Sequence, residues 1–226
     1  MSINKQILVT AFILLASIVY FGIYDIDLVL QDSFYNFQTH HWILAWYAEP
    51  YKFIFYDGAK RFLILFAVTL LIGSLLFRKK AFVQEYKKGI IIILLSAIFV
   101  PSVVGLLKSH TNMPCPKNEI RYGGVYPRTA VWESYPSDFK KPHVKCWPAG
   151  HASGGFALLS LFFLFKRKRN RFIGLGIGLF AGWSMGLYKM LIGDHFLSHT
   201  VLTMILAWLI ILLIVKILSI RENNEA

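Results

Sequence analysis

The chain has 226 residues and is too apolar for an ordinary soluble domain. Hydrophobic residues make up 56% of it and charged residues 16%, against about 45–50% and about 25% in soluble domains. This composition excludes a water-soluble enzyme and a disordered or collagen-like chain. The formal net charge of +12 would suit nucleic acid only if Lys and Arg formed one exposed face. They lie instead in clusters between apolar stretches, so we expect a membrane protein and no nucleic-acid partner.

Six apolar stretches are long enough, or nearly so, to cross a bilayer as helices. Such a helix needs about 20 apolar residues. The first stretch has no clear cleavage site, so we expect a retained span and not a signal peptide. We predict one domain over residues 1–226, an all-α, six-helix transmembrane bundle. Its spans cover Gln6–Tyr24, Arg61–Phe77, Gly89–Leu107, Ala152–Phe165, Phe172–Leu191 and Phe196–Leu218.

Basic loops set the expected orientation of the bundle, because Lys and Arg beside a span stay in the cytoplasm. Arg78–Lys88 and Lys166–Arg171 are both rich in these residues. Both termini then lie in the cytoplasm as well. The outer, extracytoplasmic segments are Asp25–Lys60, a loop-rich insert between helices three and four at Lys108–His151, and the short turn Gly193–His195.

The two longer outer segments differ in character. The aromatic stretch Trp42–Tyr56 is typical of an interfacial belt, in which rings lie at the headgroup level. The insert contains the two cysteines, Cys115 and Cys146. Outside the cytoplasm a disulfide would persist, and closing a loop of about 32 residues is worth roughly 3–4 kcal/mol. We expect this disulfide, with two free thiols as the alternative.

Ionisable residues at the outer ends of the spans are the candidates for a functional site, because they are costly to keep near lipid. They are Lys108, His151, Lys189, Asp194, His195 and His199. His195 and His199 lie four residues apart, on one helix face, so His199 can hold one nitrogen of a nucleophilic His195. His151 can act as a general acid.

The lysines favour an anion as the ligand of this site. Lys108 and Lys189 suit the oxygens of a phosphate, and the backbone at Gly150, at a helix start, suits the same anion. A histidine pair at this spacing is also a common half of a metal site. Two lysines in one pocket would repel a cation, so we expect no metal.

Three short patterns carry a family resemblance. They read Lys108-x6-Cys115-Pro116, Pro148-Ala149-Gly150-His151, and Tyr188-Lys189-x5-His195-x3-His199. This order resembles the motifs K-x6-R-P, P-S-G-H and S-R-x5-H-x3-D of the type 2 phosphatidic acid phosphatase superfamily. Within its membrane branch the chain is similar to bacterial lipid A phosphatases, in which cysteines in this insert and a P-A-G-H variant are familiar.

The resemblance implies an enzyme, a metal-independent lipid phosphatase without a cofactor that works through a phosphohistidine. It makes His195 the nucleophile, His151 the acid and His199 the residue that orients His195. Lys108, Lys189 and Gly150 then form the phosphate cradle. The implied partner is a phosphorylated lipid (lipid A, undecaprenyl diphosphate or phosphatidylglycerophosphate), cleaved at the periplasmic face of a bacterial inner membrane.

The chain departs from the family pattern at several positions. Cys115 replaces a bidentate arginine, and Lys189 replaces a guanidinium fork by a point charge. Arg121, Arg128 or Lys145 could supply the missing cation. Two alternatives to the phosphatase follow: a transferase that moves phosphate between two lipids, and a degenerate member that binds anionic lipid without turnover.

Overall fold

Seven α-helices form most of the computed structural model, which describes residues 1–136 and 139–225. Residues 137 and 138 of the predicted insert lie outside the described residues. The α-helices are α1 (Ile3–Ile23), α2 (Ile26–Asp32), α3 (Gly58–Leu76), α4 (Ala81–His110), α5 (Gly150–Ala157), α6 (Lys168–Leu191) and α7 (Leu197–Glu225). Short helical turns are η1 (Phe53–Asp57, π-helical) and the 3₁₀ turns η2 (Pro116–Asn118), η3 (Ile120–Tyr122) and η4 (Leu158–Phe163).

The chain is mostly helical, as predicted, with a short two-stranded ribbon beside the helices. Strands β1 (Tyr35–Asn36) and β2 (His41–Trp42) pair antiparallel, with Tyr35 opposite Trp42. Each strand has only two residues, too few for a recognisable alternation of apolar and polar side chains. The ribbon is held by ring contacts instead, because Tyr35 packs against both Trp42 and Tyr122.

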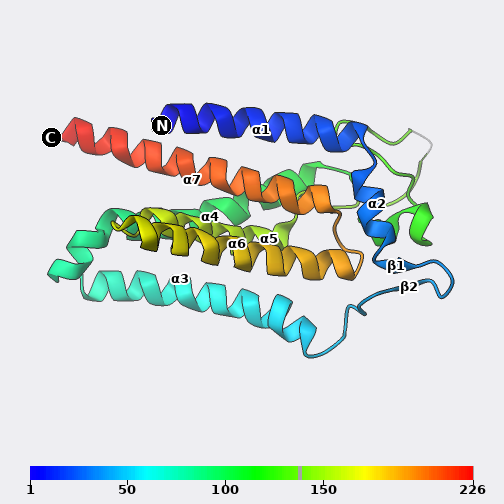
Figure 1. Cartoon of the computed structure of the whole chain (residues 1–226), viewed down its shortest axis with the longest axis horizontal. Coiled ribbons are helices and arrows are strands. Elements are labelled where there is room, and N and C mark those ends of the chain that lie inside the picture. Colours follow the sequence, from blue (N-terminus) through cyan, green and yellow to red (C-terminus); the bar gives the residue numbers. More distant parts are fainter. Residues whose placement is uncertain (137–138, 226) are drawn as a thin grey trace.

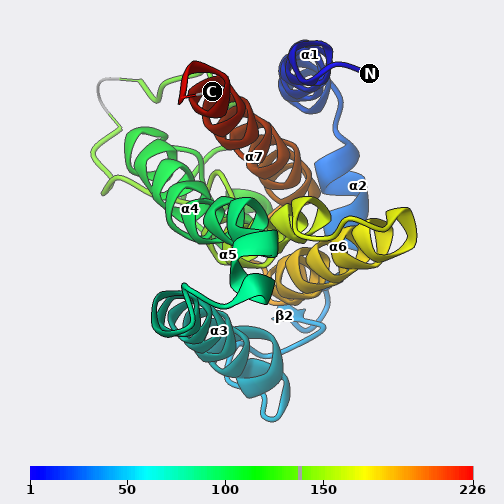
Figure 2. The ribbon, with the colours of Figure 1, turned by 90° about the vertical axis from the view of Figure 1, so that its left-hand side faces the viewer.

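The long helices run along one axis of the molecule (Figure 1). α5 packs on α4, α6 and α7, while α1 packs along α7 and α3 packs on α4. Seen from the end, α1 and α3 lie on opposite sides of this central group (Figure 2). The core therefore surrounds α5, and it includes the fully buried Phe156 and Ile211.

Four helices are long and apolar enough to cross a membrane. They are Ile3–Ile23, Phe53–Leu76, Ala81–His110 and Leu197–Arg221. α6 has 24 residues, but its glycines make it less apolar, and Gly150–Phe163 is a shorter apolar helix. The structure thus supports several membrane helices, while the count of six spans stays a prediction.

Both termini lie at one end of the bundle, and α2 and the β ribbon lie at the other (Figure 1). The turns between α3 and α4 and between η4 and α6, which carry the basic clusters, lie at the end with the termini (Figure 1). This grouping is the one that the charge pattern predicts. The side of the membrane that each end faces stays a prediction.

Small residues bring α5 close to α6. A Cβ atom on Gly155 would lie 2.6 Å from the backbone nitrogen of Gly182, and one on Gly178 would lie 2.4 Å from the nitrogen of Leu159. No larger side chain fits these contacts without moving a backbone. The sequence favours packing for Gly176 as well, but this position faces open space, so that interpretation is wrong for Gly176.

The segment between α4 and α5 is tied to the bundle at several points. The disulfide between Cys115 and Cys146 is present, with Cα atoms 5.2 Å apart, which confirms the predicted pair. The backbone N–H of Lys117 donates to the carbonyl of Gly193 (3.0 Å). The segment is therefore held against the start of α5 and against the turn between α6 and α7.

Candidate active site

Three charged or titratable residues of the site, Lys189, Asp194 and His195, lie in or beside the turn between α6 and α7. The backbone N–H groups of Asp194 and His195 both donate to the carbonyl of Lys189, at 2.8 and 3.2 Å. Gly193 makes the turn possible, because its φ is +74° and a Cβ there would lie 2.3 Å from the Trp42 ring. Only glycine satisfies both conditions. The compact turn brings Lys189, Asp194 and His195 side by side.

His195 and His199 form a buried imidazole pair. Their Nδ1 atoms are 3.3 Å apart, and the residues are 3% and 0% exposed. Two neutral imidazoles at this distance share one proton, so one Nδ1 donates and the other accepts. Burial, followed by the charges of His199 and Lys108, lowers the pKa of His195 well below its ordinary value. His195 is therefore neutral near pH 7, as a nitrogen nucleophile must be.

The start of α5 faces the same pair. The N–H of Ala149 donates to Thr203 Oγ1 on α7 (2.8 Å), which fixes the segment Pro148–His151 against α7. A Cβ on Gly150 would lie 3.7 Å from Lys108 Nζ, so an ammonium group lies directly beside this helix start. His151, Lys108 and Lys189 all act electrostatically on His195. All six predicted site residues thus gather at one place.

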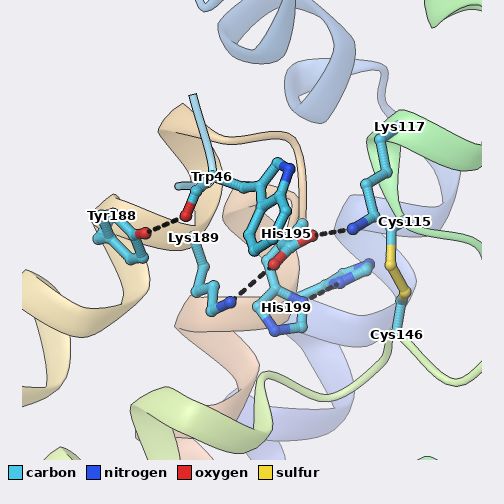
Figure 3. A network of polar contacts seen from close by, with 9 residues as sticks. Trp46, Cys115, Lys117, Cys146, Tyr188, Lys189, His195 and His199 are labelled. Carbon is cyan, nitrogen blue, oxygen red and sulfur yellow. Dashed lines mark hydrogen bonds and ion pairs between the residues drawn. A yellow bond between two sulfur atoms is a disulfide. The ribbon is translucent and has the colours of Figure 1, made fainter. Parts of the chain in front are cut away.

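Asp194 bridges Lys117 and Lys189, the two lysines that Figure 3 labels. Its Oδ2 is 2.7 Å from Lys189 Nζ, and its Oδ1 is 2.6 Å from Lys117 Nζ. Burial alone would raise the pKa of Asp194, but Lys189 and Lys117 hold it below its ordinary value. Each carboxylate oxygen takes one ammonium group. Two non-bridging oxygens of a phosphate present the same pattern of charge.

Lys117 is a site residue that the motif spacing does not indicate. Its side chain is 50% exposed at the edge of the cluster, two residues after the disulfide-bonded Cys115. Of the three cations considered from sequence, Arg121 pairs with Asp32 and Lys145 is exposed. Arg128 lies over the ring of Phe196 and acts electrostatically on His199. The only sequence signal for Lys117 is that it lies close to the position of the missing arginine.

Tyr56 is a second residue of the site that the sequence did not indicate, because it falls in the stretch predicted as an interfacial belt. Its ring centroid lies 4.4 Å from that of His151, and Lys189 Nζ lies 4.1 Å above the same ring. The interfacial belt predicted for this stretch fits Trp46 and Tyr47, which are exposed. It does not account for Tyr56, which contacts the site from η1. A π-helical turn at such a position is frequent near functional sites.

An apolar groove of about 670 Å³ opens from the cluster. It lies between α3, α4 and α5, and Lys60, Lys108, Gly150 and His151 form its polar end. Its walls are apolar, among them Ile64, Leu71, Ile93, Ala97, Leu158 and Met185. The site is thus continuous with a channel suited to a hydrocarbon chain. Among the described residues, no group of three or more His, Cys, Asp or Glu side chains is arranged to hold a metal ion.

Fold and site together define a multi-helix membrane protein with a cluster of histidines and lysines at one end of its bundle. The chain belongs to the PAP2 superfamily, which matches residues 89–222. It is also similar to a protein of Francisella tularensis subsp. novicida (strain U112) named lipid A 4'-phosphatase. The two are 25% identical over 190 residues, covering 78% of this chain and 79% of the relative. No solved structure matches the chain.

These matches support a lipid phosphatase of a bacterial inner membrane. The family match begins at Gly89, at the first buried residues of α4, and it includes every motif residue of the cluster. η1 with Tyr56, α2 and the β ribbon all lie before the matched region. The similarity to the relative covers 78% of this chain, a larger part than the family match over residues 89–222.

Proposed function

We propose that this protein hydrolyses a phosphate monoester or diphosphate on a membrane lipid at the periplasmic face, with lipid A as the first substrate to test. The observation that carries the proposal is the junction of the apolar groove with Lys108, Gly150 and His151. A soluble phosphate ester has no hydrocarbon chain that could occupy such a groove. A lipid phosphate fills both parts, with its chain between α3 and α4 and its phosphoryl group beside the imidazoles.

In the proposed reaction His195 attacks phosphorus. Its Nδ1 is engaged with His199, so Nε2 carries the free lone pair when Nδ1 holds the proton. The new P–N bond forms as the bond from phosphorus to the lipid oxygen breaks, and His151 gives a proton to that oxygen. His151 then takes a proton from water, whose oxygen attacks phosphorus and breaks the P–N bond. Phosphate leaves and both imidazoles return to their starting state.

The cations stabilise the charge that develops on the phosphoryl oxygens. Lys108 lies beside the start of α5, where backbone N–H groups lack helical acceptors, and Lys189 lies over the ring of Tyr56. We assign to Lys117 the cationic role that Cys115 leaves vacant. Asp194 holds Lys117 and Lys189 in place before substrate enters, and phosphoryl oxygens then compete with its carboxylate for both ammonium groups.

The test is phosphate release by the purified protein in detergent from lipid A, undecaprenyl diphosphate and phosphatidylglycerophosphate. We expect release from at least one lipid, its loss in His195→Ala, and its retention in His41→Ala, a control on the exposed β2 strand. Chelator should leave the rate unchanged. Transfer of phosphate to a second lipid would indicate the transferase, and binding without release the non-catalytic alternative. Wild-type turnover in His195→Ala would refute the mechanism.

A further inference from the structure

The short helix α2 places two polar side chains inside the molecule although it lies outside the family match. Asp27 is 1% exposed and Gln31 is 0% exposed. They are four residues apart and share one face of α2. Polar side chains this deeply buried are costly unless they are hydrogen-bonded, so their partners matter. Those partners lie on the two helices that flank the His195 turn.

Asp27 binds the start of α7. One carboxylate oxygen accepts the backbone N–H of Ser198 (2.8 Å), and the other accepts its hydroxyl (2.5 Å). The first N–H groups of a helix have no acceptor within it, and a carboxylate there also meets the positive end of the helix dipole. Asp27 therefore caps α7 from another helix. Ser198 is adjacent to His199 and three residues after His195.

Gln31 binds the end of α6. Its Nε2 donates to the carbonyl of Met190 (2.9 Å), the residue after Lys189. One helix face therefore holds the backbone on both sides of the turn from Met190 to Ser198, across sequence separations of 159 and 171 residues. Among the described residues, neither Asp27 nor Gln31 forms a hydrogen bond or an ion pair with the imidazoles or the lysines of the site.

We propose that α2 acts as a clamp in which Asp27 and Gln31 are positioning residues that set His195 against Lys189 and His151. This inference rests on the proposed function, because it concerns the geometry of the same reaction. A displacement of about 1 Å at a reacting group can cost about 100-fold in rate. Asp27 and Gln31 hold the two ends of the turn from α2, while Lys117 and Leu44 bind residues between those ends. The loss of either α2 side chain therefore changes the alignment and leaves the lipid groove between α3, α4 and α5 intact.

The test compares Asp27→Ala and Gln31→Ala with Asp32→Asn. Asp32 is on the same short helix but binds Arg121 and the hydroxyl of Tyr122, neither of which is on α6 or α7, so this control perturbs α2 without a direct contact to those helices. We expect kcat to fall about 100-fold in Asp27→Ala, with KM changed less than about twofold. A smaller loss in the same direction is expected in Gln31→Ala, and a wild-type kcat in Asp32→Asn. The melting temperature of each variant shows any purely structural loss, which would not separate kcat from KM.

Asp27→Asn guards against a variant that fails to fold. Its amide can still accept from the N–H of Ser198 and donate to the hydroxyl, so we expect it to retain most of the wild-type kcat. Orthovanadate, which mimics the five-coordinate transition state of phosphoryl transfer, gives a readout without turnover: it should raise the melting temperature of wild type and Asp32→Asn but not of Asp27→Ala. Equal kcat in Asp27→Ala and Asp32→Asn would overturn the clamp alone. A wild type with neither turnover nor a vanadate shift would overturn the proposed function as well.

Discussion

Gly105 offers a direct way to block the apolar groove. It lies on α4, three residues before Lys108, or about 4.5 Å along the helix axis, and it lines the groove. A Cβ at this position meets no atom within 4 Å. Gly105→Phe therefore places a ring in the groove without a clash in the protein. Phenylalanine is also a better helix former than glycine, by roughly 0.5 kcal/mol, so the helix itself should not lose stability.

The size of the effect follows from the chain that the ring displaces. The groove continues along α4 to Ile93, which lies about 18 Å beyond Gly105. A displaced chain enters detergent and not water, so the cost is that of forcing the ring and the chain into one space, about 1–3 kcal/mol. This corresponds to a loss of roughly 10- to 100-fold in kcat/KM. A phosphate ester with a very short chain does not occupy the part of the groove that the ring fills, so it should be cleaved at the wild-type rate.

Gly176→Phe is the matched control for Gly105→Phe. Gly176 lies on α6, a Cβ there also meets nothing within 4 Å, and it does not line the groove. The assay is kcat/KM of wild type and both variants on a long-chain and a short-chain lipid phosphate in detergent. We expect a selective loss for Gly105→Phe on the long chain. Equal values for the two variants, or an equal loss on both substrates, would refute the assignment of the groove to the lipid chain.

Three further predictions concern the charges around the site. Lys117→Met should raise KM about tenfold, which corresponds to the loss of roughly 1.4 kcal/mol of charge stabilisation. The free energy of unfolding should change by less than about 1 kcal/mol, because the ion pair of Lys117 with Asp194 is partly exposed. An unchanged KM would show that Lys117 does not act in the site. His199→Asp should keep or raise kcat, since a carboxylate offsets a charged His195 better than an imidazole does; an inactive variant with a normal melting temperature would contradict this. Burial raises the pKa of Glu119 to about 7 from 4.5, so its contribution to stability is complete below about pH 4.5 and is lost as the pH rises through 7, by about 3 kcal/mol. The free energy of unfolding, measured with denaturant from pH 5 to 8, should therefore fall more steeply for wild type than for Glu119→Gln. Parallel curves for the two proteins would refute the raised pKa of Glu119.

The sequence alone determined the long helices. Apolar stretches of about 20 residues can satisfy their backbone only as helices in lipid, so the positions of α1, α3, α4 and α7 follow from composition. The motif spacing also predicted that His195 and His199 interact, and their Nδ1 atoms are 3.3 Å apart. The predicted reason, one shared helix face, is wrong, because His195 lies in the turn before α7, which begins at Leu197. The sequence also predicted the disulfide between Cys115 and Cys146, because the two cysteines lie in one segment between the predicted third and fourth spans.

Only the tertiary structure decided which distant residues complete the site. Tyr56, Lys117 and Asp27 have no local pattern that marks them, since their partners lie far away in sequence. Asp27 binds Ser198 across 171 residues, and the ring of Tyr56 contacts that of His151 from a different helix. The close contact between Gly155 and Gly182 that sets α5 against α6 is of the same kind. Hydropathy and helix periodicity depend on neighbours along the chain, whereas these contacts depend on how the helices pack, which no short window of sequence encodes.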